Sequence, residues 1–204
     1  VISGKVVFDE PMSRHTSMGV GGMADALVSP GNVEELGQTI ACLKRFHIPF
    51  IPVGNGTNLI VKDGGYRGVI ISMKGLHDIT LTERGAEQIS VYAGAGAALS
   101  EIVLLAAEQS LTGMEFCAGI PGSIGGAVKM NAGAYGSEIR NVIETVELMN
   151  SSNEILKYKG DELNFEYRNL DLPADTMITG ASFLLTRGKK EQIQERIKEI
   201  IGMR

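Results

Sequence analysis

The sequence contains no tryptophan and only two cysteines, and aromatic residues make up just 5% of it. Cys42 and Cys117 lie far apart with no CxxC spacing, which excludes a zinc knuckle or a disulfide framework and indicates a reducing, cytoplasmic setting. Apolar stretches such as residues 102–107 are much shorter than the roughly 20 residues that a membrane-spanning helix needs. With no signal peptide at its start, the chain is predicted to have no membrane partner.

An excess of positive charge is also missing. Lysine and arginine total 19 against 24 acidic residues, for a formal net charge of -5, and no basic stripe alternates with aromatic residues. This pattern predicts that nucleic acid is not a partner. The three histidines, His15, His47 and His77, are scattered without carboxylate partners at ligand spacing, so we expect surface or turn positions and no metal site. Cys117 is expected to be a small buried thiol.

The chain does contain enough apolar residues, 44% of 204, to bury a substantial core. Asn32 and Glu35 predict a capping box, and helical spacing of apolar residues continues to Phe46. Three short β-branched runs follow, at residues 50–53, 59–61 and 69–72. We therefore expect a first α+β unit over residues 1–73.

The remaining pattern predicts a second α+β unit over residues 74–188. Its expected elements are hairpins and single segments in the following order: strands 79–81 and 89–93, helix 98–109, strands 142–149 and 155–158, and strand 177–186. A charged helix over residues 189–203, with isoleucines along one side, comes last. The predicted fold class is α+β with two subdomains.

The segment Gly54-Asn55-Gly56-Thr57-Asn58 directly follows the predicted strand 50–53. Backbone N–H groups in such a glycine turn can form a concave site for a pyrophosphate, although a bare turn between strands gives a similar pattern. The lysine of a Walker loop is absent. Gly19, Gly21 and Ala24 match the dinucleotide-binding spacing, but a predicted strand follows them instead of a helix, so we interpret this match as accidental.

Residues 113–136 form the most informative segment, GMEFCAGIPGSIGGAVKMNAGAYG. Pro121 with Gly122 predicts a bend, and Ser123 is expected to cap a short helix through Met130. Gly125 and Gly126 remove side chains where a flat ring could lie close to the backbone. The segment is therefore a candidate wall for a planar cofactor. Within it, Glu115 and Lys129 face either the cofactor or solvent.

These motifs together resemble the UDP-N-acetylenolpyruvoylglucosamine reductases (MurB), within the vanillyl-alcohol-oxidase-type (PCMH-type) FAD-binding fold. The resemblance rests on four segments in order: Thr16 with GGMAD at 21–25, VGNGTNLIVKDGGYRGVII at 53–71, GIPGSIGGAVKMNAGAYGSEI at 119–139, and FEYR at 165–168. They span nearly the whole chain, and the third is highly specific. One mismatch is Leu170, which stands where the family often has serine.

The resemblance implies non-covalent FAD, NADPH as hydride donor, and reduction of a UDP-sugar enolpyruvyl ether to UDP-N-acetylmuramate in peptidoglycan synthesis. The residues that it assigns to the cofactor are Gly54, Asn55, Gly56, Thr57, Asn58, Leu59, Gly119, Ile120, Pro121, Gly122, Ser123, Gly125, Gly126, Asn131, Gly133, Ala134 and Ile178. Arg168 matches the arginine beside the substrate carboxylate, where a fixed cation stabilises the enolate formed by hydride addition. Tyr167 precedes it in the same motif.

The family also uses a serine proton donor and a glutamate in a later domain, and neither motif occurs in these 204 residues. The resemblance therefore implies a FAD-binding portion, with helix 189–204 leading toward an absent substrate domain and with little turnover by this chain alone. We expect a monomer. Two alternatives are another flavin oxidoreductase of the same fold, such as an alcohol oxidase with covalent flavin, and a non-catalytic binding protein.

Overall fold

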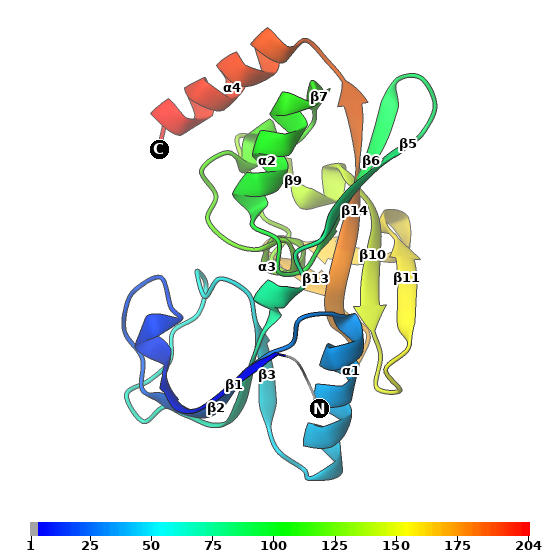
Figure 1. Cartoon of the computed structure of the whole chain (residues 1–204). Coiled ribbons are helices and arrows are strands. Elements are labelled where there is room, and N and C mark those ends of the chain that lie inside the picture. Colours follow the sequence, from blue (N-terminus) through cyan, green and yellow to red (C-terminus); the bar gives the residue numbers. More distant parts are fainter. Residues whose placement is uncertain (1–3) are drawn as a thin grey trace.

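The structure is a computed structural model that describes residues 4–204. Its two larger sheets lie one above the other, with the final helix at the far end of the larger one (Figure 1). No helix within residues 4–204 is both long and apolar enough to cross a lipid bilayer.

The first sheet has the order β1-β2-β4-β3. Its strands are β1 (Lys5–Pro11), β2 (Met23–Ser29), β3 (Phe50–Val53) and β4 (Tyr66–Ser72). β1 pairs antiparallel with β2, whereas β4 runs parallel to both of its neighbours. The GxGxxA match at Gly19 therefore leads into a strand, as expected, and not into the helix of a dinucleotide-binding motif.

Helix α1 (Val33–Arg45) covers one face of this sheet. Its predicted cap is confirmed, because the Asn32 side chain accepts a hydrogen bond from the Glu35 N–H at 2.9 Å. The Glu35 carboxylate in turn accepts a hydrogen bond from the Gly31 N–H at 2.8 Å, one residue before the N–H that a capping box uses. The cap thus satisfies two amide groups at the start of the helix.

The predicted strand at residues 59–61 is wrong. β3 and β4 already pair directly, so no strand edge is available between them. Instead, Leu59 and Val61 pack on the face of the sheet opposite α1, in a small cluster with Met12 and Ile70. Alternating apolar residues usually indicate a strand. Here Leu59 and Val61 are partly buried in a segment that is not a strand.

The second sheet has the order β11-β10-β14-β6-β5, and β7 adds to β14. Its strands are β5 (Ile79–Glu83), β6 (Gln88–Gly94), β7 (Leu111–Thr112), β10 (Ile143–Met149), β11 (Ile155–Lys159) and β14 (Met177–Arg187). Every pairing in it is antiparallel. Two short hairpins, β8 (Gly133–Ala134) with β9 (Ser137–Glu138) and β12 (Asn164–Glu166) with β13 (Asn169–Asp171), stand apart. Both long predicted hairpins are confirmed.

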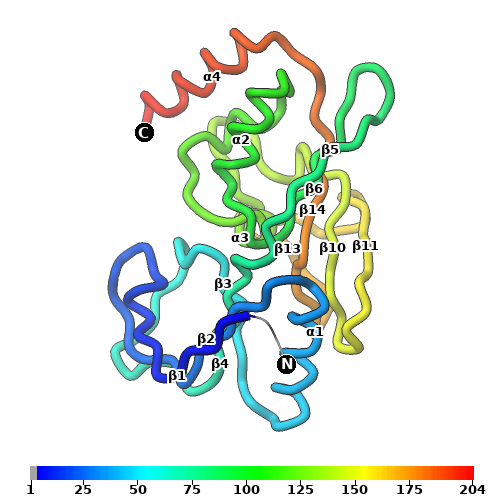
Figure 2. Tube along the Cα trace, viewed as in Figure 1, coloured from blue at the N-terminus to red at the C-terminus, as the bar shows by residue number. Residues whose placement is uncertain are grey.

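Three helices accompany this sheet: α2 (Leu99–Glu108), α3 (Ile124–Lys129) and α4 (Lys190–Gly202). α4 lies at the top of Figure 2. It packs on α2 and on the short 3-10 helix Glu115–Cys117. On its predicted apolar side, Ile193 and Ile200 are buried, but Ile201 is 56% exposed. A single buried cluster runs from α1 through both sheets to α4, so the two sheets share one hydrophobic core.

Candidate functional site

The loop after β3 and the segment after α2 meet and enclose a cavity of about 560 Å³. One wall is residues 51–59 and the other comes from residues 120–132, with Arg168 at the edge. The volume lies within the range of about 300–1,000 Å³ that is usual for cofactor and ligand pockets. The two segments that the sequence singled out independently therefore form one site.

Contacts between the two walls fix their spacing. The Thr57 hydroxyl donates to the Pro121 carbonyl at 3.3 Å. Gly54 lies so close to Ser123 that a Cβ at Gly54 would be 2.0 Å from the serine Oγ. Ser123 is buried and directly precedes α3, but its side chain makes no capping hydrogen bond. The expectation that it caps this helix is therefore wrong.

The loop at residues 15–17 packs against the Gly54–Asn58 turn. Gly56 has φ +66°, and a Cβ there would lie 1.8 Å from the His15 carbonyl oxygen. The Ser17 N–H donates to the Gly56 carbonyl at 3.1 Å. His15 does have a carboxylate partner, contrary to expectation: its Nε2 lies 2.8 Å from Glu10, and this hydrogen bond lowers the pKa of that carboxyl.

The turn leaves backbone donors unused. In the described part of the chain, the N–H groups of residues 55–58 donate to no other residue. The side chains of Asn55 and Asn58 also line the cavity, and the Asn58 amide donates to the Met130 sulfur at 3.4 Å. Such a row of unpaired amides suits the oxygens of a phosphate group.

Glycines on the opposite wall leave room for a flat ring. Gly122 (φ +143°) and Gly126 both line the cavity, and a Cβ at Gly126 would meet nothing closer than Ser123 Oγ at 3.5 Å. The rest of this wall is largely apolar, with Ile120, Ala127 and Met130. The residues present therefore fit a cofactor with a pyrophosphate and a planar ring, which is the chemistry of FAD.

A second hollow of about 340 Å³ adjoins the first. It is lined by residues 131–141 together with Tyr167 and Arg168, so Arg168 lies on the boundary between the two hollows. Tyr167 is 88% exposed, and the Arg168 guanidinium lies 5.9 Å from its ring centre. A guanidinium in this position can bind a carboxylate with two parallel hydrogen bonds.

Most of the candidate residues predicted from the sequence line the first cavity or the second hollow. Those lining the first cavity are Gly54, Asn55, Gly56, Thr57, Asn58, Leu59, Ile120, Pro121, Gly122, Ser123, Gly126 and Arg168. Those lining the second hollow are Asn131, Gly133, Ala134, Tyr167 and Arg168. Gly119, Gly125 and Ile178 line neither; Ile178 is buried in β14, and the Gly119 carbonyl accepts a hydrogen bond from Arg204 at 3.2 Å.

Sequence reasoning missed several residues of the first cavity, among them Ile51 and Pro52 in β3. Lys129, left undecided between cofactor and solvent, also lines it. Glu115 bonds to Thr112 and to the Gly113 N–H instead, which makes it a structural residue. The thiol of Cys117 is fully buried, as expected, and burial raises its pKa to about 12.

Comparison with known proteins supports the class that this geometry defines. A family model described as "FAD binding domain" matches residues 24–159. Cholesterol oxidase from Brevibacterium sterolicum has a similar structure over 91% of the chain and 38% of its own, with a TM-score of 0.65 at 17% identity, a likeness of fold alone. The chain thus belongs to the FAD binding domain family, and its fold is of the vanillyl-alcohol-oxidase (PCMH) type.

Closer relatives narrow the assignment. The UDP-N-acetylenolpyruvoylglucosamine reductase of Syntrophus aciditrophicus is 48% identical over all of this chain and 65% of its own length, and that of Caldanaerobacter subterraneus subsp. tengcongensis is 43% identical over 97% and 64%. The crystal structure of the MurB protein from Thermus caldophilus matches with a TM-score of 0.82 and 31% identity, over 100% of this chain and 70% of that one. The chain belongs to the UDP-N-acetylenolpyruvoylglucosamine reductase (MurB) family. It spans slightly under two thirds of the length of the first two relatives.

Proposed function

We propose that this chain holds FAD non-covalently in the cavity between residues 51–59 and 120–132, as the flavin portion of a reductase in peptidoglycan synthesis. The observation that supports this most is a cavity of about 560 Å³ that has a turn with free backbone amides on one side and a glycine-containing wall on the other. In this proposal the Gly54–Asn58 turn binds the pyrophosphate, and Gly122 with Gly126 lies against the flavin ring. Residues 131–134 complete the edge of the site.

For the whole protein we propose reduction of a UDP-N-acetylglucosamine enolpyruvyl ether to UDP-N-acetylmuramate. The chemistry that bound FAD supplies is two-electron hydride transfer, from NADPH to the enolpyruvyl double bond. Arg168 holds the substrate carboxylate and stabilises the negative charge that builds on it, and Tyr167 borders the same hollow. Lys129 adds a second cation to the cavity wall.

The proposal extends to organisation and setting. We propose a division into FAD-binding subdomains at residues 1–73 and 74–188, followed by a connecting helix at 189–204. We further propose a cytoplasmic monomer whose partners are small molecules, and neither nucleic acid nor membrane. An excess of acidic over basic residues and the scarcity of cysteine support this setting.

The test is retention of flavin absorbance by the purified chain after incubation with FAD and desalting. Gly126→Val places a side chain in the open cavity, and we expect FAD affinity at least about tenfold weaker, a change of about 1.4 kcal/mol. Gly202→Val makes the same change at another helical glycine with open space around it, and affinity should not change. Equal FAD affinity in the two variants would contradict the proposed site.

Release of the flavin on denaturation separates the proposal from its nearest alternative. A non-covalent cofactor leaves the denatured chain, whereas a covalently linked flavin, as in some oxidases of this fold, remains attached. A chain that retains no flavin under any condition would favour a non-catalytic binding protein instead.

A further inference from the structure

The Tyr167–Arg168 turn, here called the arginine turn, joins two strands of only three residues each, β12 and β13. Such a small hairpin is not stable by itself in water. Arg168 also has φ +58°, in the left-handed region that is unfavourable for a residue with a side chain. Contacts from outside the hairpin must therefore hold the turn in place.

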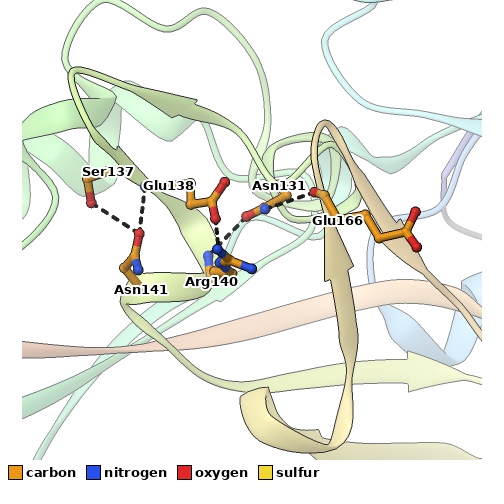
Figure 3. A network of polar contacts seen from close by, with 6 residues as sticks. All are labelled: Asn131, Ser137, Glu138, Arg140, Asn141 and Glu166. Carbon is orange, nitrogen blue, oxygen red and sulfur yellow. Dashed lines mark hydrogen bonds and ion pairs between the residues drawn. The ribbon is translucent and has the colours of Figure 1, made fainter.

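One such contact comes from Asn131, on the strand-β12 side of the turn. Its side-chain N–H donates to the Glu166 backbone carbonyl at 3.1 Å, and its side-chain oxygen accepts a hydrogen bond from the Arg140 backbone N–H at 3.1 Å (Figure 3). Asn131 is only 2% exposed, so both bonds are shielded from water. This residue links the end of α3 to the residue immediately before Tyr167.

The other contact comes from Lys129, on the strand-β13 side. Its ammonium donates to the Leu170 carbonyl at 2.7 Å and to the Asn169 side-chain oxygen at 3.1 Å. Leu170 itself is fully buried, so the carbonyl that accepts this bond is held by packing. The arginine turn is thus gripped on both sides by two residues that lie two positions apart in the chain.

We propose that Lys129 and Asn131 are positioning residues that fix Arg168 relative to the flavin cavity. The short helix α3, which ends at Lys129, also carries Gly126 and Ala127 of the cavity wall, so the three hydrogen bonds fix the position of the guanidinium relative to that wall. The role in reduction rests on the proposed function, because it assumes that Arg168 binds the substrate carboxylate. The holding of the turn itself does not depend on FAD or on turnover.

Limited trypsin digestion measures this directly, because trypsin cleaves after Arg168 and can do so only when the turn detaches from the fold. In the purified chain, with and without added FAD, Lys129→Met should raise the cleavage rate at Arg168 by about tenfold, the effect expected from losing charge-assisted hydrogen bonds. Lys129→Arg keeps a charged donor and should restore the rate to within about threefold of the original.

Lys157→Met is the matched control, since it removes a strand lysine that pairs with Glu147 at 3.0 Å and has no contact with the arginine turn. Cleavage at Arg168 should be unchanged in it. If Lys129→Met does not fold, Asn169→Ala removes one of the two acceptors and should give about a threefold increase.

Two results would overturn the inference. One is an unchanged rate at Arg168 in Lys129→Met; the other is an equal rise at every cleavage site, which reports global destabilisation instead of a local hold. The cleavage rate at Arg168 does not depend on bound cofactor. If the chain binds no FAD, Lys129→Met should still raise this rate about tenfold, so failure of the FAD proposal and failure of this inference give different results.

Discussion

Gly56 shows how strongly a single backbone position constrains the proposed cofactor loop. Its positive φ and its approach to His15 leave no room for a side chain. Gly64, in the same connection between β3 and β4, has open space where a Cβ would lie, with no atom within 4 Å, and no positive φ. The backbone geometry therefore requires glycine at position 56 and does not require it at position 64.

Gly56→Ala should lower the free energy of unfolding by about 2 kcal/mol or more, because left-handed strain adds to a backbone clash. Urea unfolding followed by circular dichroism measures the change. Gly64→Ala is the control and should be neutral or slightly stabilising, since alanine restricts the unfolded chain. Equal effects of the two substitutions would show that the close approach at Gly56 does not constrain the loop.

At the scale of single elements, α1 illustrates a helix that its own sequence specifies. Asn32 accepts the Glu35 N–H, acidic residues occupy the first turn, and Lys44 and Arg45 occupy the last. Each of these features favours the helix through its terminal amides and its dipole. α3 is different, because it is six residues long and its first residue is preceded by a serine that does not cap it.

Asn32→Ala should therefore destabilise the chain by about 1 kcal/mol through loss of the cap. Thermal and urea unfolding measure this change. Gln38→Ala, at an exposed position of the same helix where the side chain makes one long contact with Glu34, should have little effect. A neutral Asn32→Ala would mean that packing of α1 on the core, and not its cap, sets its stability.

At the scale of the whole molecule, one continuous core joins the two sheets and includes Cys117. Burial raises the pKa of this thiol from 9.0 to about 12, so in the alkaline range the unfolded chain loses a proton that the folded chain keeps. Tyr92, whose pKa rises to about 12 through burial and the nearby Glu147 carboxylate, acts in the same direction. Stability should consequently fall as the pH rises above about 9.

Cys117→Ala should flatten this alkaline slope by as much as about 1.4 kcal/mol per pH unit, the linkage for one proton. The measurement is urea unfolding at a series of pH values from about 8 to about 11. Cys42→Ala removes the exposed thiol of α1 and should leave the slope as it is. The cavity left at Cys117 lowers stability at every pH, so only the slope, and not the absolute value, tests the argument.

Local patterns determined much of this protein. Capping and periodicity placed α1, α2 and α4, and alternating residues placed both long hairpins, because these signals act within a few residues of chain. The four motifs by themselves pointed to the family and to FAD. The 59–61 run failed as a strand because its apolar residues found a sheet face instead of a sheet edge.

Only the tertiary structure decided how the motifs meet. Thr57 contacts Pro121 across 64 positions of sequence, and Lys129 reaches Leu170 across 41. Contacts at such separations depend on the packing of whole sheets and leave no periodic trace in the chain. For the same reason the sequence singled out Arg168, Lys129 and Asn131, but not the contacts by which the last two hold the turn that carries Arg168.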